Sequence, residues 1–126
     1  MKDIKTLKVS AKDFYFENIA GKSIVNKDTG ITVLFSKNGI RHLLNYKRNN
    51  FPQLELVFDL MKAVRDAKFS NFKNKDANEL KEVIGYMNFN YAKMIDNKKE
   101  TFRINIRITK DGKFYYHHSL TTKKKS

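Results

Sequence analysis

Apolar and polar residues alternate most regularly near the end of the chain. The segment 102–108 reads Phe-Arg-Ile-Asn-Ile-Arg-Ile, so a β-strand here would carry its apolar side chains on one face and its arginines on the other. The segment 110–113 contains the Asp-Gly pair of a tight turn, and the residues that follow favour a second strand. The pattern predicts a hairpin of strands 101–109 and 113–121.

The length of the loop decides which residues of this hairpin face each other. A two-residue turn would set the isoleucines opposite polar residues such as His117. A three-residue loop, with Gly112 in the left-handed region, pairs Thr109 with Lys113 and sets apolar residues opposite one another. We expect this second register, because it keeps a single apolar face. The open polar face then carries Arg103, Asn105, Arg107, Tyr115, His117, Ser119 and Thr121.

The preceding part of the chain predicts a shorter hairpin followed by helices. Apolar residues at 23–25 and 31–35 flank turn-forming residues, which indicates an antiparallel pair. Ser36 suits the N-cap of a helix over 37–48, and Pro52 suits the start of a helix that continues to residue 67. The remaining expectations are a short helical turn or strand within 11–16, a loop over 69–76, a short helix over 76–85, a strand over 86–95 and a turn over 96–100.

Together these elements predict an α+β fold. An N-terminal hairpin and two or three helices pack on one face of a C-terminal, three-stranded antiparallel sheet, and the other face remains free. The length of 126 residues suits one domain. We expect an N-terminal extension at 1–20, the folded domain at 21–121 and a basic tail at 122–126.

The net charge is the most informative feature of the composition. The chain carries 26 Lys and Arg residues against 13 Asp and Glu residues, a net charge of +13, which indicates a polyanionic partner such as a nucleic acid. A basic surface without a partner and a surface that docks an acidic protein are the alternatives. Cysteine is absent, which excludes disulfides and thiolate chemistry. No apolar run approaches the ~20 residues of a membrane span, and the first residues lack the apolar stretch of a secretory signal, so we expect no membrane partner and a cytoplasmic location.

Three histidines are candidates for acid–base chemistry, because imidazole exchanges protons near neutral pH. The expected register puts His117 on the polar face and His118 on the semi-buried apolar side, and a one-residue slip would exchange them. His42 lies in the first turns of a predicted helix, where a surface position or a partial cap is the ordinary role, and the preceding Arg41 favours a site at the sheet edge. No acidic cluster lies near the histidines, and three histidines without cysteine do not readily supply the ligands of a zinc site. We therefore expect neither a metal nor a cofactor.

Three segments of the chain resemble a known family: Ala20–Ile31, Phe35–His42 and Lys113–Leu120. In order and spacing they are similar to the phage-associated domains of the Barnase–EndoU–colicin–RelE-like nuclease superfamily. The resemblance implies a small α+β fold with helices that lead into an antiparallel sheet, and a metal-independent, toxin-like RNase directed at tRNA or other cellular RNA. In many members the position of His117 is acidic and that of His118 is retained, so the resemblance and the face argument favour different histidines.

The leading hypothesis is therefore an endoribonuclease that produces a 2′,3′-cyclic phosphate. His42 would take the proton from a ribose 2′-hydroxyl, and His117 or His118 would protonate the leaving 5′-oxygen. Arginines would stabilise the charge on the phosphorane, and a tyrosine would stack on a base. The predicted catalytic residues are His42, His117, His118, Ser119 and Thr121, and the predicted phosphate- and substrate-binding residues are Arg41, Arg103, Arg107, Tyr115, Tyr116 and Lys37.

Two partners follow from this hypothesis, namely RNA and an acidic immunity or antitoxin protein that would neutralise the enzyme. The alternative hypothesis is a non-catalytic, basic nucleic-acid-binding module of a phage or mobile-element protein. Such a module would use the same basic face for contacts with the nucleic-acid backbone and would need no histidine chemistry.

Overall fold

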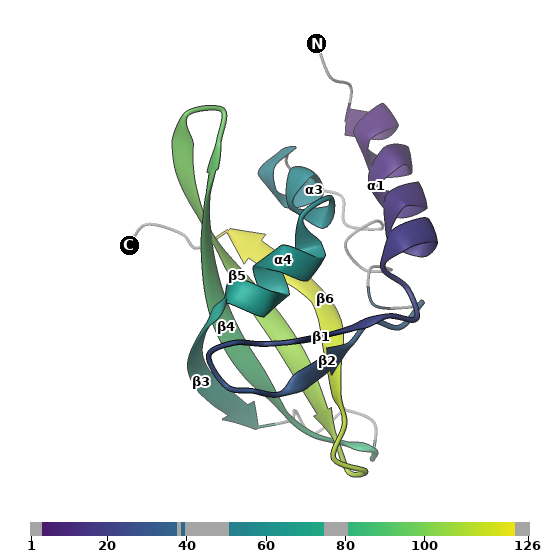
Figure 1. Cartoon of the computed structure of the whole chain (residues 1–126), viewed down its shortest axis with the longest axis vertical. Coiled ribbons are helices and arrows are strands. Elements are labelled where there is room, and N and C mark those ends of the chain that lie inside the picture. The colour runs from purple at the N-terminus through teal and green to yellow at the C-terminus, as the bar shows by residue number, and fades with distance from the viewer. Residues whose placement is uncertain (1–3, 38, 40–50, 75–80, 123–126) are drawn as a thin grey trace.

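The fold places helices against a six-stranded sheet (Figure 1). The computed structural model describes residues 4–37, 39, 51–74 and 81–122, with side chains for all of these except 51–53 and 118–122. The strands follow the order β1-β2-β6-β5-β4-β3, and every described neighbouring pair is antiparallel except β2 and β6, which run parallel. The expected α+β class is confirmed, although the sheet is mixed and larger than the three-stranded one expected.

The first described element is the helix α1, Ile4–Asn18. The sequence had suggested only a short turn or strand within 11–16. Leu7, Ala11 and Tyr15 recur at intervals of four residues, which places them on one face of the helix, and these three and Ile19, just beyond its end, are buried in the core. Most of the segment 1–20 therefore contributes a helix that packs in the same core as the sheet.

The short hairpin appears as expected. Strand β1, Ser23–Val25, pairs with β2, Thr32–Leu34, in antiparallel register. Asn26 starts the turn and is itself buried, and its side-chain amide donates to the carbonyl oxygens of Val64 and Ala67 at 2.8 and 2.9 Å. The hairpin is thereby fixed to the end of a helix far along the chain.

The helix expected over 52–67 is instead two short helices, α3 at Phe51–Val57 and α4 at Leu60–Asp66. Backbone hydrogen bonds from Phe58 to Glu55 and from Asp59 to Leu56 close α3 in a tight final turn and interrupt the helix. The carboxylate of Asp59 caps neither helix and pairs with Lys93. The other expected helix, over 37–48, lies outside the described residues except for positions 37 and 39.

Strands β3, Lys68–Asn74, and β4, Val83–Ile95, replace two elements that the sequence predicted wrongly. The loop expected over 69–76 is largely strand, because residues 68–74 pair with β4 on either side of a bulge between Phe69 and Asn71. The helix expected over 76–85 is wrong at 83–85, which belongs to β4, and residues 76–80 lie outside the described part of the chain. The strand expected over 86–95 is confirmed.

Strand β5, Lys98–Thr109, continues from β4 through a two-residue turn, shorter than the turn expected over 96–100. Asp96 and Asn97 have φ values of 51° and 66° there, a conformation that Asp and Asn tolerate better than most residues. Strand β6, Phe114–Thr122, completes the sheet.

The three-residue loop between β5 and β6 is confirmed. Gly112 has φ +78°, and Thr109 donates its backbone N–H to the carbonyl of Lys113 at 3.0 Å. The expected pairings of Ile108 with Phe114 and of Ile106 with Tyr116 both occur. Further along, a bulge in β6 adds two residues, so Phe102 pairs with Thr122 and not with the expected Leu120.

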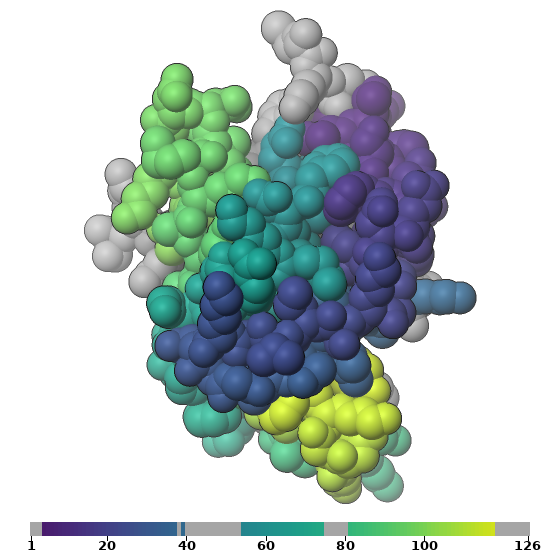
Figure 2. Space-filling model, viewed as in Figure 1, coloured from purple at the N-terminus to yellow at the C-terminus, as the bar shows by residue number. Residues whose placement is uncertain are grey.

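One face of the sheet packs on the helices and forms the core. From that side the β1–β2 hairpin and the helices cover the central strands, while the β4–β5 hairpin projects beyond them (Figure 2). The opposite face carries none of the described helices, yet it is not fully open as expected. Tyr86 and Asn88 lie on it and are only 6% and 7% exposed. Buried residues of the core-facing side include Val33, Met87, Phe89, Phe102, Ile104, Ile106 and Tyr116.

Candidate nucleic-acid interface

The polar face, which we define as the side chains of β3–β6 opposite the core, is built in rows that cross the strands. The register aligns Lys73, Tyr86, Arg107 and Tyr115 in the first row. The second row is Asn71, Asn88, Asn105 and His117, and the third is Lys68, Asn90, Arg103 and the position of Thr121. Rows are two residues apart along β4 and β5, roughly 7 Å, and bulges in β3 and β6 widen the spacing between the second and third rows there. Cations therefore flank a row of amides that ends at a histidine.

Three side chains of the polar face form a compact cluster. The ring centroids of Tyr86 and His117 are 5.3 Å apart, with the ring planes inclined by 53°. The guanidinium carbon of Arg107 lies 6.0 Å from the centroid of the Tyr86 ring. A tyrosine ring attracts cations over its electron-rich face, so this geometry holds an arginine and an imidazole around one ring.

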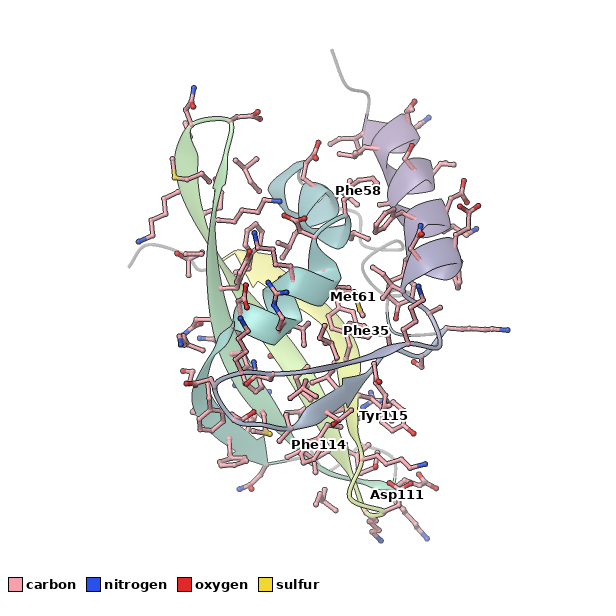
Figure 3. The ribbon with its side chains drawn as sticks, viewed as in Figure 1. Phe35, Phe58, Met61, Asp111, Phe114 and Tyr115 are labelled. Atoms are coloured by element: carbon pink, nitrogen blue, oxygen red, sulfur yellow. The ribbon has the colours of Figure 1, made fainter. Side chains whose placement is uncertain are left out.

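The charged residues in the three rows of the polar face are all positive. Lys68, Lys73 and Arg103 are exposed and Arg107 is partly buried, whereas no position of the three rows carries an aspartate or glutamate. The β5–β6 turn carries a carboxylate, Asp111, which lies beyond Phe114 and Tyr115 (Figure 3). A hydrogen bond from the Thr109 hydroxyl lowers the pKa of Asp111, with further help from the charge of Lys113.

The structure brings together four of the predicted site residues: Arg103, Arg107, Tyr115 and His117. Tyr116 lies on the other face, where its ring packs against those of Tyr15 and Phe35 in the core. Burial raises the pKa of the Tyr116 phenol well above its usual value. Lys37 is exposed, three residues beyond the end of β2.

The other predicted residues are placed only in part. The backbones of His118, Ser119 and Thr121 belong to β6, and their side chains lie outside the described set. Arg41 and His42 lie outside the described residues altogether. Within the described residues, no group of three or more His, Cys, Asp or Glu side chains is arranged to hold a metal ion.

The site predicted from the sequence did not include Tyr86 and Asn88, although the alternation of polar and apolar residues in their segment indicated the polar face. In the segment 86–91 the residues Tyr86, Asn88 and Asn90 alternate with Met87, Phe89 and Tyr91, and the expected strand over 86–95 would have set the first three on the polar face. Lys73 and Asn71 gave no such signal, because their segment was expected to be a loop.

Comparison with known proteins identifies the family. No curated protein and no solved structure matches the chain. None of the helices in the described ranges is both long and apolar enough to cross a membrane. A family model, Large polyvalent protein-associated domain 3, matches residues 2–116, which include α1, the β1–β2 and β4–β5 hairpins and most of the polar face, and end just before His117. The chain belongs to this phage-associated family, Large polyvalent protein-associated domain 3.

Proposed function

We propose that this domain is a metal-independent endoribonuclease that binds RNA on the polar face. The observation that carries the proposal is the position of His117, which lies between the two arginine-bearing rows and against Tyr86, with no carboxylate among the three rows. A phosphodiester is the substrate that suits such a face, because arginine binds phosphate oxygens and imidazole transfers protons near neutral pH.

In the proposed reaction His117 acts as the general acid and protonates the leaving 5′-oxygen. The attacking 2′-hydroxyl gives its proton to a second group, for which His42 and His118 are the sequence candidates. Attack of the 2′-oxygen on phosphorus and departure of the 5′-oxygen leave a 2′,3′-cyclic phosphate and a free 5′-hydroxyl. Arg107 and Arg103 stabilise the negative charge of the phosphorane, and Tyr115 offers a ring for stacking on a base.

The wider setting of this activity is part of the same proposal. Membership of the Barnase–EndoU–colicin–RelE-like superfamily would explain the order of helices and antiparallel strands, and tRNA in the bacterial cytoplasm is the substrate that such toxin-like enzymes meet. An acidic neutralising protein would be attracted by the same lysines and arginines that attract RNA.

A second candidate function is binding of nucleic acid without cleavage. It is favoured by the composition of the three rows, in which lysines, arginines and asparagines, residue types that contact the nucleic-acid backbone, occupy most positions. The amide row and the flanking cations suffice for binding, since backbone contacts supply most of the affinity for nucleic acids.

One experiment separates the two functions. The purified protein is incubated with total tRNA in EDTA, and the products are resolved on a denaturing gel. Replacement of His117 by Gln should lower the cleavage rate by roughly 10²–10⁴-fold, the usual worth of a positioned acid or base, and His42→Gln and His118→Gln should identify the second group. Lys12→Gln, which removes one charge from exposed α1, is the matched control and should cut at the normal rate.

The binding function predicts a different result. Native protein would leave the tRNA intact in EDTA and would retard it in a native gel in a salt-sensitive manner, and His117→Gln would change neither behaviour by much. That outcome would refute the proposed endoribonuclease.

A further inference from the structure

Tyr86 and His117 come from strands that are not neighbours. Tyr86 belongs to β4 and His117 to β6, and β5 lies between them. Adjacent strands lie about 4.8 Å apart, so the backbones of β4 and β6 are separated by roughly 10 Å. A centroid distance of 5.3 Å between the two rings requires both side chains to lean over β5.

The side chains of β5 lie beneath this ring pair. The Nε atom of Arg107 and the Oδ1 atom of Asn105 are both inaccessible to solvent, although Arg107 and Asn105 face away from the core. Tyr86 itself is 6% exposed on the same face. Tyr86 and His117 thus lean over the strand whose polar atoms are buried, on the side of the sheet that none of the described helices covers.

The ring of Tyr86 also interacts electrostatically with the cationic groups beside it. Among the described residues, the charged and titratable groups in the rows around His117 are Arg107 and Arg103 from β5, Lys73 from β3, and the phenols of Tyr86 and Tyr115 from β4 and β6. The fixed charges among these described groups are positive, and like charges disfavour a protonated imidazole. The electron-rich face of Tyr86, in contact with both Arg107 and His117, is the group among these that offsets the repulsion.

We propose that Tyr86 is a positioning residue: its ring holds the His117 imidazole over β5, beside Arg107, and favours the protonated form that can donate a proton. The effect of Tyr86 on catalysis rests on the proposed endoribonuclease activity. The contact between the Tyr86 and His117 rings is independent of that activity. Replacing Tyr86 by Leu removes the π-face but keeps an apolar side chain, and replacing it by Phe keeps the ring and removes only the hydroxyl.

The test is an NMR titration of the His117 ring protons in the unliganded protein, with the signal assigned by its loss in His117→Gln. Tyr86→Leu should lower the pH midpoint of His117 by about half a unit or more, and Tyr86→Phe should leave it near the native value. The rate of tRNA cleavage at pH 6–7 should be reduced in Tyr86→Leu and should stay near the native rate in Tyr86→Phe.

The native protein supplies a second measurement that does not depend on the folding of a variant. The ring resonances of Tyr86 should shift in step with the titration of His117, whereas those of Tyr91, on the core-facing side of β4, should not. Independent titrations of Tyr86 and His117 in the native protein, or a native midpoint retained in folded Tyr86→Leu, would overturn the positioning role. Failure of the native protein to cleave RNA would overturn the endoribonuclease and leave the NMR result to decide the role of Tyr86.

Discussion

At the scale of single residues, Asn26 shows how one buried side chain fixes two distant parts of the chain. Its amide nitrogen donates to the carbonyls of Val64 and Ala67, and its Oδ1 accepts from the backbone N–H and the hydroxyl of Thr29, at 2.9 and 2.8 Å. Every hydrogen-bonding group of the side chain is used, and the residue is 1% exposed. The β1–β2 hairpin is thus tied to the end of α4.

Replacement of Asn26 by Ala should therefore lower the free energy of unfolding by roughly 2–3 kcal/mol, because two buried carbonyls lose their donor. Urea denaturation followed by circular dichroism measures this change. Asn18→Ala is the matched control, since exposed Asn18 makes a single side-chain bond of 3.2 Å to the carbonyl of Phe14 within α1. Equal losses in the two variants would contradict the structural role assigned to Asn26.

At the scale of elements, the sequence predicted well those strands whose side chains alternate without interruption. The segment 102–108 alternates cleanly, and the loop length then placed Arg103, Arg107, Tyr115 and His117 together on the polar face. Strand β3 was missed because the bulge between Phe69 and Asn71 sets Phe69 and Phe72 three residues apart, which breaks the period of two.

The contact between Tyr86 and His117 could not have been predicted from periodicity. Alternation assigns a residue to a face, but the row that it occupies depends on the register of β4 against β5. The bulge between Val83 and Gly85 shifts that register near the start of β4. The lean of two rings over an intervening strand is a result of packing, which no pattern of single residues encodes.

The docking of α1 on the sheet makes the stability of the protein sensitive to alkaline pH. Tyr15 of α1 and Tyr116 of β6 pack 6.5 Å apart, and the Tyr15 hydroxyl donates to the carbonyl of Ser36 at 2.6 Å. Burial raises the pKa of both phenols above the ordinary value of 10.0. Below that pH both phenols are protonated in the folded and unfolded chains, so their full contribution to stability is present.

Above about pH 10 the unfolded chain loses these two protons while the folded protein keeps them, so the free energy of unfolding should fall. The slope is up to ~1.4 kcal/mol per pH unit for each tyrosine. Urea midpoints between pH 9 and 11.5 measure it, and Tyr15→Phe should have the shallower slope although it starts from a lower stability. Lysine ionisation affects both proteins alike, so parallel slopes would contradict the role of Tyr15.

At the scale of the whole molecule, the arrangement of the charged residues indicates where RNA would bind, which the net charge alone does not. The net charge of +13 is spread over the chain, and α1 on the core-facing side of the sheet carries Lys5, Lys8 and Lys12. The polar face differs from α1 in that its cations flank a row of amides and a histidine and are unaccompanied by carboxylates, whereas α1 also carries Asp13 and Glu17. A polyanion that responded only to net charge would not distinguish the two surfaces.

A pair of charge reversals tests this distinction. Arg103→Glu on the polar face and Lys12→Glu on α1 both lower the net charge by two, and both residues are exposed. If RNA lies on the polar face, Arg103→Glu should weaken binding of a single-stranded RNA oligomer and make the slope of log K against log salt shallower by about 0.7, the loss of one phosphate contact. Lys12→Glu should leave the slope unchanged, since it affects only the long-range field. Fluorescence anisotropy between 50 and 300 mM salt measures both slopes, and an equal effect of the two reversals would mean that RNA is attracted to the chain without a defined interface.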